Sequence, residues 1–391
     1  MSIQGIDAAS VHRLTSGQVV TDLQTCVKEL VENSLDAGAT SIEVRFKQHG
    51  LGSIEVIDNG SGIAPADYDS VALKHYTSKL ATFDDIASVR TFGFRGEALS
   101  SLCALCESVT VLTATEDEAP MGTVLEFDAR GRVKSRSGKA ARQRGTTVTL
   151  TKLFAPLPVR RKDLEKNAKR EFGKALGLLQ AYALVPCSKE NGGVRFTVSN
   201  QLDVGGRKVQ LQTKGNGSIQ AAVTALWGPK AMENVVTLDI AFDVEAERGA
   251  LKRLAPTTHV QVKGLISKFM PGCGRQSSDR QYLFVNGRPC NLSKVQKAFN
   301  ETYRLFNATQ TPFVIADIIL PTDTCDINVS PDKRTIFLHS ESNLIVALKV
   351  CLAASLHSFL TSAAGGTGER VRILALNIQD QLRFFGAGAR V

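Results

Sequence analysis

Residues 27–40 read VKELVENSLDAGAT, and this stretch decides the fold of the region around it. An apolar stripe at the spacing of one helix face runs through and just before it: Leu23, Cys26, Val27, Leu30 and Val31. Glu29 and Asn33 lie one helical turn apart beside that stripe, and Asp36 follows on the same side. The pattern predicts a helix from about residue 23 to residue 35, which buries its apolar face and presents a carboxylate and an amide to a neighbouring cavity.

A second motif, IEVIDNGSG at residues 54–62, reads as a strand that ends in a glycine turn. Asp58 stands at the strand end, where its carboxylate can accept a hydrogen bond from an exocyclic amine such as N6 of adenine. Gly60 and Gly62 permit the positive φ and close backbone approach of a turn around a ligand. The alternative is a β-turn in which the aspartate bonds its own backbone, and such turns are common in sequences of this kind.

A third motif, TFGFRGEALSSL at residues 91–102, predicts a loop that enters a helix. The loop is Gly93-Phe94-Arg95-Gly96, and the helix begins at Glu97-Ala98-Leu99. Backbone N–H groups at a helix start would hold phosphate oxygens, and the glycines would let the loop move as a lid. An ordinary helix-entry loop is the alternative. Gly145-Thr146-Thr147 adds a backbone turn and hydroxyls at the start of another strand.

Together these motifs favour a pocket for a metal-bound nucleotide. Hydrolysis of ATP needs an activated water, a divalent cation on the phosphates and donors for the developing charge. Glu29 is the candidate general base. Asn33 offers a neutral oxygen of the kind that Mg²⁺ accepts. Either residue alone would be interpreted as a polar side chain facing solvent.

The 391 residues, 43% of them hydrophobic, are enough for two ordinary domains. No run reaches the ~18 apolar residues of a membrane span, and the N-terminus does not read as a secretory signal. Eight cysteines are scattered singly, except for Cys103 and Cys106, which lie in a helical run without a second pair to complete a zinc site. Buried, reduced thiols and an intracellular compartment are expected.

Positive charge is concentrated in one stretch. The net charge is +9, and residues 130–174 hold fifteen Lys or Arg against Asp163, Glu165 and Glu171, which is +12 and leaves about −3 for the remainder. A polyanionic partner and a solvated flexible loop are equally good interpretations of such a stretch on charge alone.

The order of helical and strand patterns along the chain predicts two mixed units. Helices are predicted near residues 7–14, 66–74, 97–105 and 163–183 besides the one at 23–35, with paired strands at 41–46 and 53–59. After the KGNGS break come further helices and antiparallel strands, including a hairpin in DINVSPDKRTIFL and a closing helix at about 343–360. The fold class expected is an α+β sandwich. The domains expected are 1–212 and 213–361, with 362–391 as a poorly ordered tail.

The motifs KELVENSLDAGAT, DNGSG, TSK, GFRGEAL, GTTV and NVSPDK occur in an order that resembles the MutL DNA mismatch repair proteins. These belong to the superfamily of gyrase, heat-shock chaperone and histidine kinase ATPases. The likeness runs from about Val11 to Leu360, and SGQVV, HYTSK and FGFRGEALSSLCAL look like the eukaryotic PMS-type subunit. The resemblance implies a two-layer ATPase sandwich of the gyrase/MutL type followed by a smaller, ribosomal-S-five-like α+β domain.

The resemblance also implies the roles of particular residues in binding ATP and Mg²⁺. Glu29 would activate water, Asn33 would hold the metal, and Asp58 would bind adenine. The lid and the helix start after it would hold the phosphates. Lys333, in NVSPDK, matches a family lysine that reaches the γ-phosphate from the second domain, a chemically reasonable place for a positive charge. The full nucleotide-binding set expected is Asn33, Asp58, Gly60, Gly62, Thr77, Ser78, Lys79, Gly93, Phe94, Arg95, Gly96, Glu97, Ala98, Leu99 and Thr146.

The function implied is that of an ATP-gated DNA clamp with slow ATP hydrolysis, located in the nucleus. The partners implied are an MLH-type subunit, DNA and the MutS-type mismatch-recognition complex. The metal-dependent nicking motif of PMS-type proteins does not occur in this sequence, so no nicking activity is expected of it. A gyrase-like or chaperone-like ATPase is disfavoured by GFRGEAL and NVSPDK. A nucleotide-switched DNA-binding module with negligible turnover remains the alternative.

For DNA, the basic stretch and the second domain are expected to contact phosphates without reading sequence, because aromatic residues for base stacking are scarce among the charges. The residues expected to make these contacts are Arg160, Arg161, Lys162, Arg280, Arg288, Lys294 and Lys297.

Overall fold

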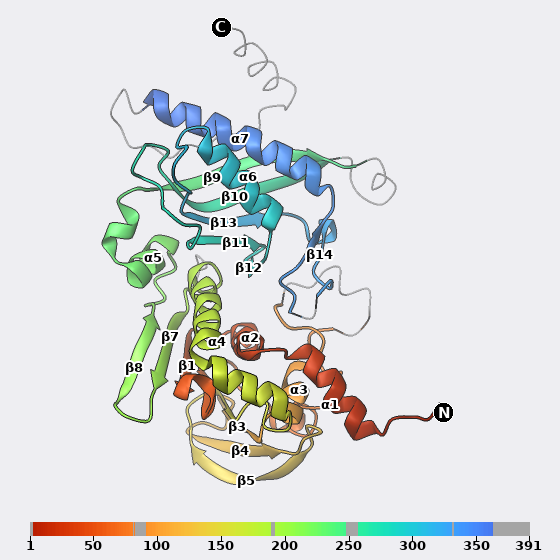
Figure 1. Cartoon of the computed structure of the whole chain (residues 1–391). Helices are drawn as coiled ribbons and strands as arrows, with labels where there is room; N and C mark the ends of the chain where they lie inside the picture. Colours follow the sequence, from red (N-terminus) through yellow and green to blue (C-terminus); the bar gives the residue numbers. More distant parts are fainter. Residues whose placement is uncertain are drawn as a thin grey trace. The chain divides into compact units, whose positions relative to one another are not determined.

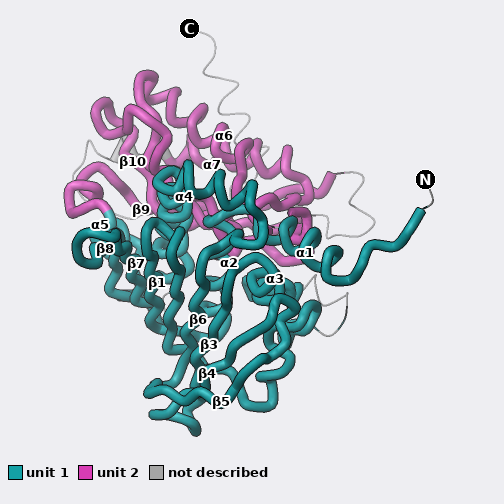
Figure 2. Tube along the Cα trace, turned by 60° about the horizontal axis from the view of Figure 1, so that its bottom comes forward, with its two compact units in different colours: residues 1–226 teal, residues 227–391 magenta. Residues whose placement is uncertain are grey.

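The computed structural model describes residues 3–80, 82, 91–188, 192–247, 257–330 and 332–362, with side chains up to 355 in the last range. The chain divides into two compact units, residues 1–226 and 227–391 (Figure 2). The boundary falls fourteen residues beyond the 212/213 division expected from sequence. Leu226 explains the difference, because it packs against the core of the first unit and ties the helix Ile219–Trp227 (α5) to that core.

An eight-stranded sheet forms the framework of the first unit (Figure 1), in the order β5-β4-β3-β6-β2-β1-β7-β8. Its strands are β1 Ser41–Lys47, β2 Ser53–Asp58, β3 Ser108–Ala114, β4 Met121–Phe127, β5 Val133–Ala141, β6 Gly145–Thr151, β7 Arg195–Gln201 and β8 Arg207–Gln212. β1 pairs with β2 antiparallel, as predicted, and with β7 in parallel. The remaining pairs are antiparallel.

Helices cover one face of this sheet (Figure 1). They are α2 Leu23–Asp36, α3 Ala98–Leu105 and α4 Pro158–Leu184, and α1 Ala8–Val19 packs against α3. On β1, Ile42, Val44 and Phe46 point into the core, whereas Glu43 and Arg45 pair with each other on the opposite face. This alternation is what one buried sheet face requires. The apolar stripe predicted for α2 is buried in the same core. The α+β two-layer fold expected of this unit is therefore confirmed.

Two local predictions are wrong, the helix at 66–74 and the flexible loop, and one strand of the first unit was not predicted. Residues 66–74 do not form a helix. A 3-10 turn at Pro65–Asp67 is followed by tight turns that bury Tyr68 and Ala72, so the helix-like apolar spacing is satisfied by isolated turns and not by a continuous helix. β5 was not predicted, because its basic, polar residues lack a buried face, which an edge strand does not need. The flexible-loop interpretation of the basic stretch is therefore wrong, since residues 133–141 and 158–184 are a strand and a helix.

The second unit is a five-stranded sheet in the order β12-β11-β13-β10-β9, with helices α6 and α7. The strands are β9 Val235–Glu245, β10 Thr257–Ser267, β11 Gln281–Val285, β12 Arg288–Pro289 and β13 Val314–Ile319, and the helices are α6 Ser293–Arg304 and α7 Glu341–Ser362. β9 was not predicted. The hairpin in DINVSPDKRTIFL is present as the short pair β14 Cys325–Asp326 and β15 Phe337–Leu338.

All eight cysteines lie in the described residues and are free thiols, six of them buried. Burial holds the pKa of Cys26, Cys106 and Cys187 well above that of a free thiol, which makes these sulfurs poor nucleophiles. Of the helices described, none has the length and apolar content to cross a membrane. The tail expected at 362–391 lies outside the described residues, except for Ser362 at the end of α7.

Candidate nucleotide-binding site

Helix α2 presents both residues that the sequence assigned to metal and water chemistry. It begins behind Asp22, whose side chain accepts a hydrogen bond from the Thr25 N–H at 2.7 Å, an N-cap that fixes the start of the helix. Glu29 is buried, whereas Asn33, one turn later, is exposed. α2 thus carries a desolvated carboxylate and an accessible amide on adjoining turns.

Asp58 ends strand β2 and is buried, with 8% of its surface exposed. Its carboxylate accepts hydrogen bonds from the Gly60 N–H at 2.9 Å and the Ser34 hydroxyl at 2.9 Å. The Gly60 bond is the Asx turn that the sequence offered as an alternative. The carboxylate is buried and also binds Ser34, so the turn is not its whole environment. The turn and a ligand-binding role are therefore compatible. Burial raises the pKa of Asp58, and the donors from Gly60 and Ser34 oppose that rise.

The GTT turn lies against Asp58, a contact that the sequence did not predict. The Thr146 N–H donates to the Asp58 carboxylate at 3.1 Å, and the Thr146 hydroxyl lies 3.1 Å from that of Thr113. Gly145 has a φ of +128°, and a Cβ there would come 2.2 Å from the Asp58 carbonyl oxygen. Only glycine allows this approach. Three segments far apart in sequence therefore meet at one carboxylate.

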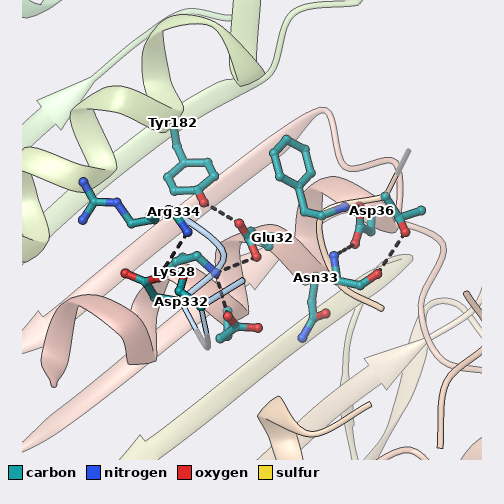
Figure 3. A network of polar contacts seen from close by, with 12 residues as sticks. Lys28, Glu32, Asn33, Asp36, Tyr182, Asp332 and Arg334 are labelled. Carbon is teal, nitrogen blue, oxygen red and sulfur yellow. Dashed lines mark hydrogen bonds and ion pairs between the residues drawn. The ribbon is translucent and has the colours of Figure 1, made fainter. Parts of the chain in front are cut away.

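Asp36 anchors the start of the lid (Figure 3). Its carboxylate accepts the backbone N–H groups of Phe92 at 2.8 Å and Gly93 at 2.9 Å, and it forms an ion pair with the Lys79 ammonium at 2.6 Å. Lys79 also lies 3.3 Å from the Asn33 side-chain oxygen. The lid, the TSK segment and α2 therefore converge on one acidic group. The helical spacing of α2 predicts the face on which Asp36 lies, but it does not predict this anchoring role.

The lid ends where helix α3 begins. Gly96 has a φ of +61°, and a Cβ there would lie 2.3 Å from the carbonyl oxygen of Tyr76. Glu97, at the N-cap of α3, makes no side-chain capping hydrogen bond. The first-turn N–H groups of Ala98 and Leu99 therefore receive no side-chain cap from this residue, which suits a helix start that binds an anion. Phe94 is buried, and the Arg95 guanidinium lies over its ring at 5.8 Å.

The donor set around Asn33 fits a small hard cation. The Asn33 amide oxygen and the Asp36 carboxylate are oxygen ligands of the type Mg²⁺ prefers, and the Lys79 ammonium shows that positive charge is stable beside them. Among the described residues, no cluster of three or more His, Cys, Asp or Glu side chains could hold a metal by itself. A magnesium ion here would therefore take most of its ligands from phosphates and water.

The other two residues of the TSK segment lie beside Lys79. Thr77 accepts the Lys79 N–H at 3.1 Å, and Ser78 lies between them.

Lys333 belongs to the second unit and has a φ of +55°, with its N–H bonded to the Ser330 carbonyl at 3.1 Å.

The residues expected to contact DNA are partly engaged inside their own units. Arg160 and Arg161 donate to the backbone carbonyls of Gly17, Leu51 and Leu153. Arg288 is buried, Arg280 lies 4.9 Å from the Trp227 ring centroid, and Lys294 and Lys297 pair with Glu341 and Glu301. Lys162 is exposed.

Family models match the two parts of the chain. Residues 21–138 match the histidine kinase-, DNA gyrase B- and HSP90-like ATPase model, and residues 226–357 match the DNA mismatch repair protein, C-terminal domain. The first match covers α2, Asp58 and the lid. The second begins at the boundary between the units.

Known relatives agree with both matches. The chain is 43% identical over 348 residues to the DNA mismatch repair protein pms1 of Schizosaccharomyces pombe, covering 89% of this chain and 41% of that protein. It is 43% identical over 354 residues to the mismatch repair endonuclease PMS2 of Homo sapiens, covering 90% and 40%. The chain thus spans about two fifths of the length of these relatives.

A crystal structure described as the N-terminal domain of a DNA repair protein matches nearly end to end. It has a TM-score of 0.78 and 40% identity, and the match covers 90% of this chain and 99% of that one. The family models, the relatives in sequence and this crystal structure therefore agree. The chain belongs to the PMS-type MutL homologues of DNA mismatch repair and corresponds to their N-terminal region, with its ATPase domain of the gyrase and HSP90 type.

Proposed function

We propose that the first unit binds Mg–ATP and hydrolyses it slowly, as the nucleotide-gated part of a mismatch repair MutL complex. The observation that carries the proposal is the convergence of three segments on α2. Asp58 contacts Ser34, and both Lys79 and the lid contact Asp36. One helix therefore links the expected adenine end of the pocket to its expected phosphate end.

Asp58 is the proposed adenine acceptor. Its ionised form would accept the N6 amine, and Gly60, Ser34 and Thr146 already hold the carboxylate in a fixed orientation. At the other end, N–H groups of the lid and of α3 would bind phosphate oxygens. Bound Mg²⁺ would neutralise phosphate charge, and Asn33 is the side chain that would hold it. Glu29 would accept a proton from the attacking water.

Replacing Glu29 and Asn33 separately tests this division of roles. Glu29→Ala is expected to keep nucleotide affinity near wild type and to lower hydrolysis by roughly 10²-fold or more, the scale on which a lost general base is felt. Asn33→Ala is expected to weaken binding of Mg–ATP itself. Single-turnover hydrolysis with protein in excess, measured beside equilibrium nucleotide binding, separates the two effects.

The same experiment decides between a slow ATPase and a pure switch. If wild-type protein in excess binds ATP and leaves it intact, the chain is a nucleotide-switched DNA-binding module. If Glu29→Ala hydrolyses ATP at the wild-type rate, Glu29 has no part in the mechanism. Normal Mg–ATP affinity of Asn33→Ala would contradict its metal role.

The wider role follows from the family. We propose a nuclear heterodimer with an MLH-type subunit that receives signals from a MutS-type mismatch-recognition complex. ATP would favour association of the ATPase regions around DNA, and hydrolysis would reset this clamp. Lys333 is proposed to sense the γ-phosphate, so it would affect the response to ATP but not to ADP.

DNA binding is proposed to depend on the exposed side of α4. Lys162, Lys166 and Lys169 lie at positions i, i+4 and i+7, are exposed, and form no ion pair within the described part of the chain. They are better candidates than Arg160 and Arg161, whose guanidinium groups already bond backbone carbonyls. Phosphate contacts by such lysines would not depend on DNA sequence.

A further inference from the structure

A buried charged network contacts Glu29 through Lys28, and Figure 3 labels its members Lys28, Glu32 and Tyr182. The Lys28 ammonium lies 2.6 Å from a Glu29 carboxylate oxygen and 2.9 Å from one of Glu32. The Tyr182 hydroxyl, from α4, donates to the other Glu32 oxygen at 2.5 Å. Lys28, Glu32 and Tyr182 are almost completely buried, with exposed fractions of 1%, 0% and 1%.

Simple helix geometry does not explain the bond between Lys28 and Glu29. Neighbouring residues point in different directions from a helix, whereas Lys28 and Glu32 are at i,i+4 and face each other. The lysine stem must therefore be held over toward Glu29. Glu32 is the partner that faces Lys28 on the helix, and the Tyr182 hydroxyl fixes Glu32.

The ammonium in this network stays charged. Burial lowers the pKa of Lys28, but Glu32 and Glu29 together outweigh that effect, and the pKa is raised. One cation is therefore shared by two carboxylates in a place with little water. If Glu32 were absent, the whole charge of Lys28 would fall on Glu29, which would stabilise the carboxylate and weaken it as a base.

We infer that Glu32 and Tyr182 are positioning residues for hydrolysis: Tyr182 fixes Glu32, Glu32 takes part of the charge of Lys28, and Glu29 is left oriented and basic. This inference rests on the proposed role of Glu29. Neither Glu32 nor Tyr182 contacts the nucleotide in this scheme. Both act through Lys28 on the carboxylate that contacts water.

Tyr182→Phe is the primary test, because it removes one hydroxyl and keeps the ring that packs near Phe92. The rate of single-turnover ATP hydrolysis is expected to fall by roughly 3- to 10-fold, since a hydrogen bond to a charged group is lost. ADP affinity is expected to stay unchanged. Tyr303→Phe is the matched control, because Tyr303 is equally buried in the second unit and donates to the Lys268 carbonyl at 2.8 Å. Its hydrolysis rate should equal that of the wild type.

The same substitution in a Glu29→Ala background tests whether Tyr182 acts through Glu29. Residual hydrolysis of the double variant should equal that of Glu29→Ala alone, because no carboxylate is left to position. Glu32→Gln, a second variant of nearly the same shape, should show the same dependence on Glu29.

Three results would count against the inference in different ways. An unchanged rate in Tyr182→Phe would overturn it alone, as would an equal loss of rate with and without Glu29. A rate loss in Tyr303→Phe as large as that in Tyr182→Phe would also overturn it, because the effect would then be a general loss of stability. If Glu29→Ala itself hydrolyses ATP normally, the proposed function fails and the inference fails with it.

Discussion

At the scale of single residues, Asp58 carries the most information about ligand binding. Its carboxylate is buried and held by donors from Ser34, Gly60 and Thr146. Such a group is costly to ionise in an empty pocket, because burial disfavours its charged form. An amine that donates to it would recover part of that cost, which makes the site selective for a ligand with a suitably placed donor.

The raised pKa of Asp58 predicts how nucleotide affinity depends on pH. Adenine N6 requires the ionised carboxylate, so affinity should fall as the pH drops through a midpoint above the ordinary aspartate value of about 3.9. Titration of a fluorescent adenine nucleotide across that range measures the midpoint. Asp58→Asn should bind more weakly at neutral pH and lose this pH dependence. The amide can keep the bonds from Gly60 and Thr146 through its oxygen, so the variant should fold.

The folded protein should also respond to pH through this residue. Because the folded pKa of Asp58 lies above its unfolded value, the folded state binds its proton more tightly, and the contribution of Asp58 to the free energy of unfolding decreases as the pH rises. Asp58→Asn should therefore raise the unfolding temperature of the nucleotide-free protein at neutral pH. A lower unfolding temperature would mean that the carboxylate stabilises the empty pocket.

At the scale of elements, the lid depends on the last turn of α2. Asp36 accepts two consecutive N–H groups, from Phe92 and Gly93, and binds Lys79 as well. In Asp36→Asn the charge is lost and one oxygen becomes a donor, so at least one lid N–H loses its acceptor. Amide hydrogen exchange at Phe92 and Gly93 should accelerate by roughly tenfold or more, on the scale of a lost charge-assisted bond.

A control for this experiment lies on the same unit. Asp128 accepts the N–H groups of Arg130 and Arg132 through one oxygen in an exposed turn, so Asp128→Ala removes a similar pair of bonds away from the lid. It should speed exchange locally and leave Phe92 and Gly93 unaffected. Equal protection of these two amides in Asp36→Asn and wild type would show that Asp36 does not hold the lid.

The elements that sequence predicted well are those whose pattern is local. α2, β1 and β2 were predicted because their apolar residues repeat at 3.6 or 2. β5 and the turns at 66–74 were not, since neither depends on a regular apolar face. Within the site, the burial of Glu32 could not be predicted, because its partner Tyr182 is 150 positions away. Asp36 could have been found, since it lies on the face of Glu29 and Asn33.

At the scale of the whole molecule, the two units match separate family models, and the boundary lies where α5 still packs on the first core. The boundary predicted from the sequence, at 212/213, is earlier, because the glycines of KGNGS resemble a linker. The basic stretch crosses several elements, an edge strand and a long helix among them, so its +12 charge is not one compact patch. Its contribution to binding must therefore be tested one element at a time.

The exposed lysines of α4 give the sharpest test of DNA binding. Reversing Lys162, Lys166 and Lys169 to Glu should reduce the slope of log K against log salt by up to roughly 2.7, at about 0.9 for each lost contact with duplex phosphate. All DNA sequences should be weakened alike, and ATP binding should be retained, because none of these lysines bonds a residue of the nucleotide site. Fluorescence anisotropy at several salt concentrations measures the slope.

A charge-matched variant separates local contact from net charge. Arg207, Lys208 and Lys214 are exposed on or just after β8, and reversing them changes the net charge of the protein by the same amount. If α4 contacts phosphates, the β8 variant loses affinity only through the weaker long-range field and keeps most of its salt slope. Equal slopes for both variants would mean that net charge alone attracts DNA. An unchanged slope in the α4 variant would transfer the proposed contacts to Arg280 and its neighbours in the second unit.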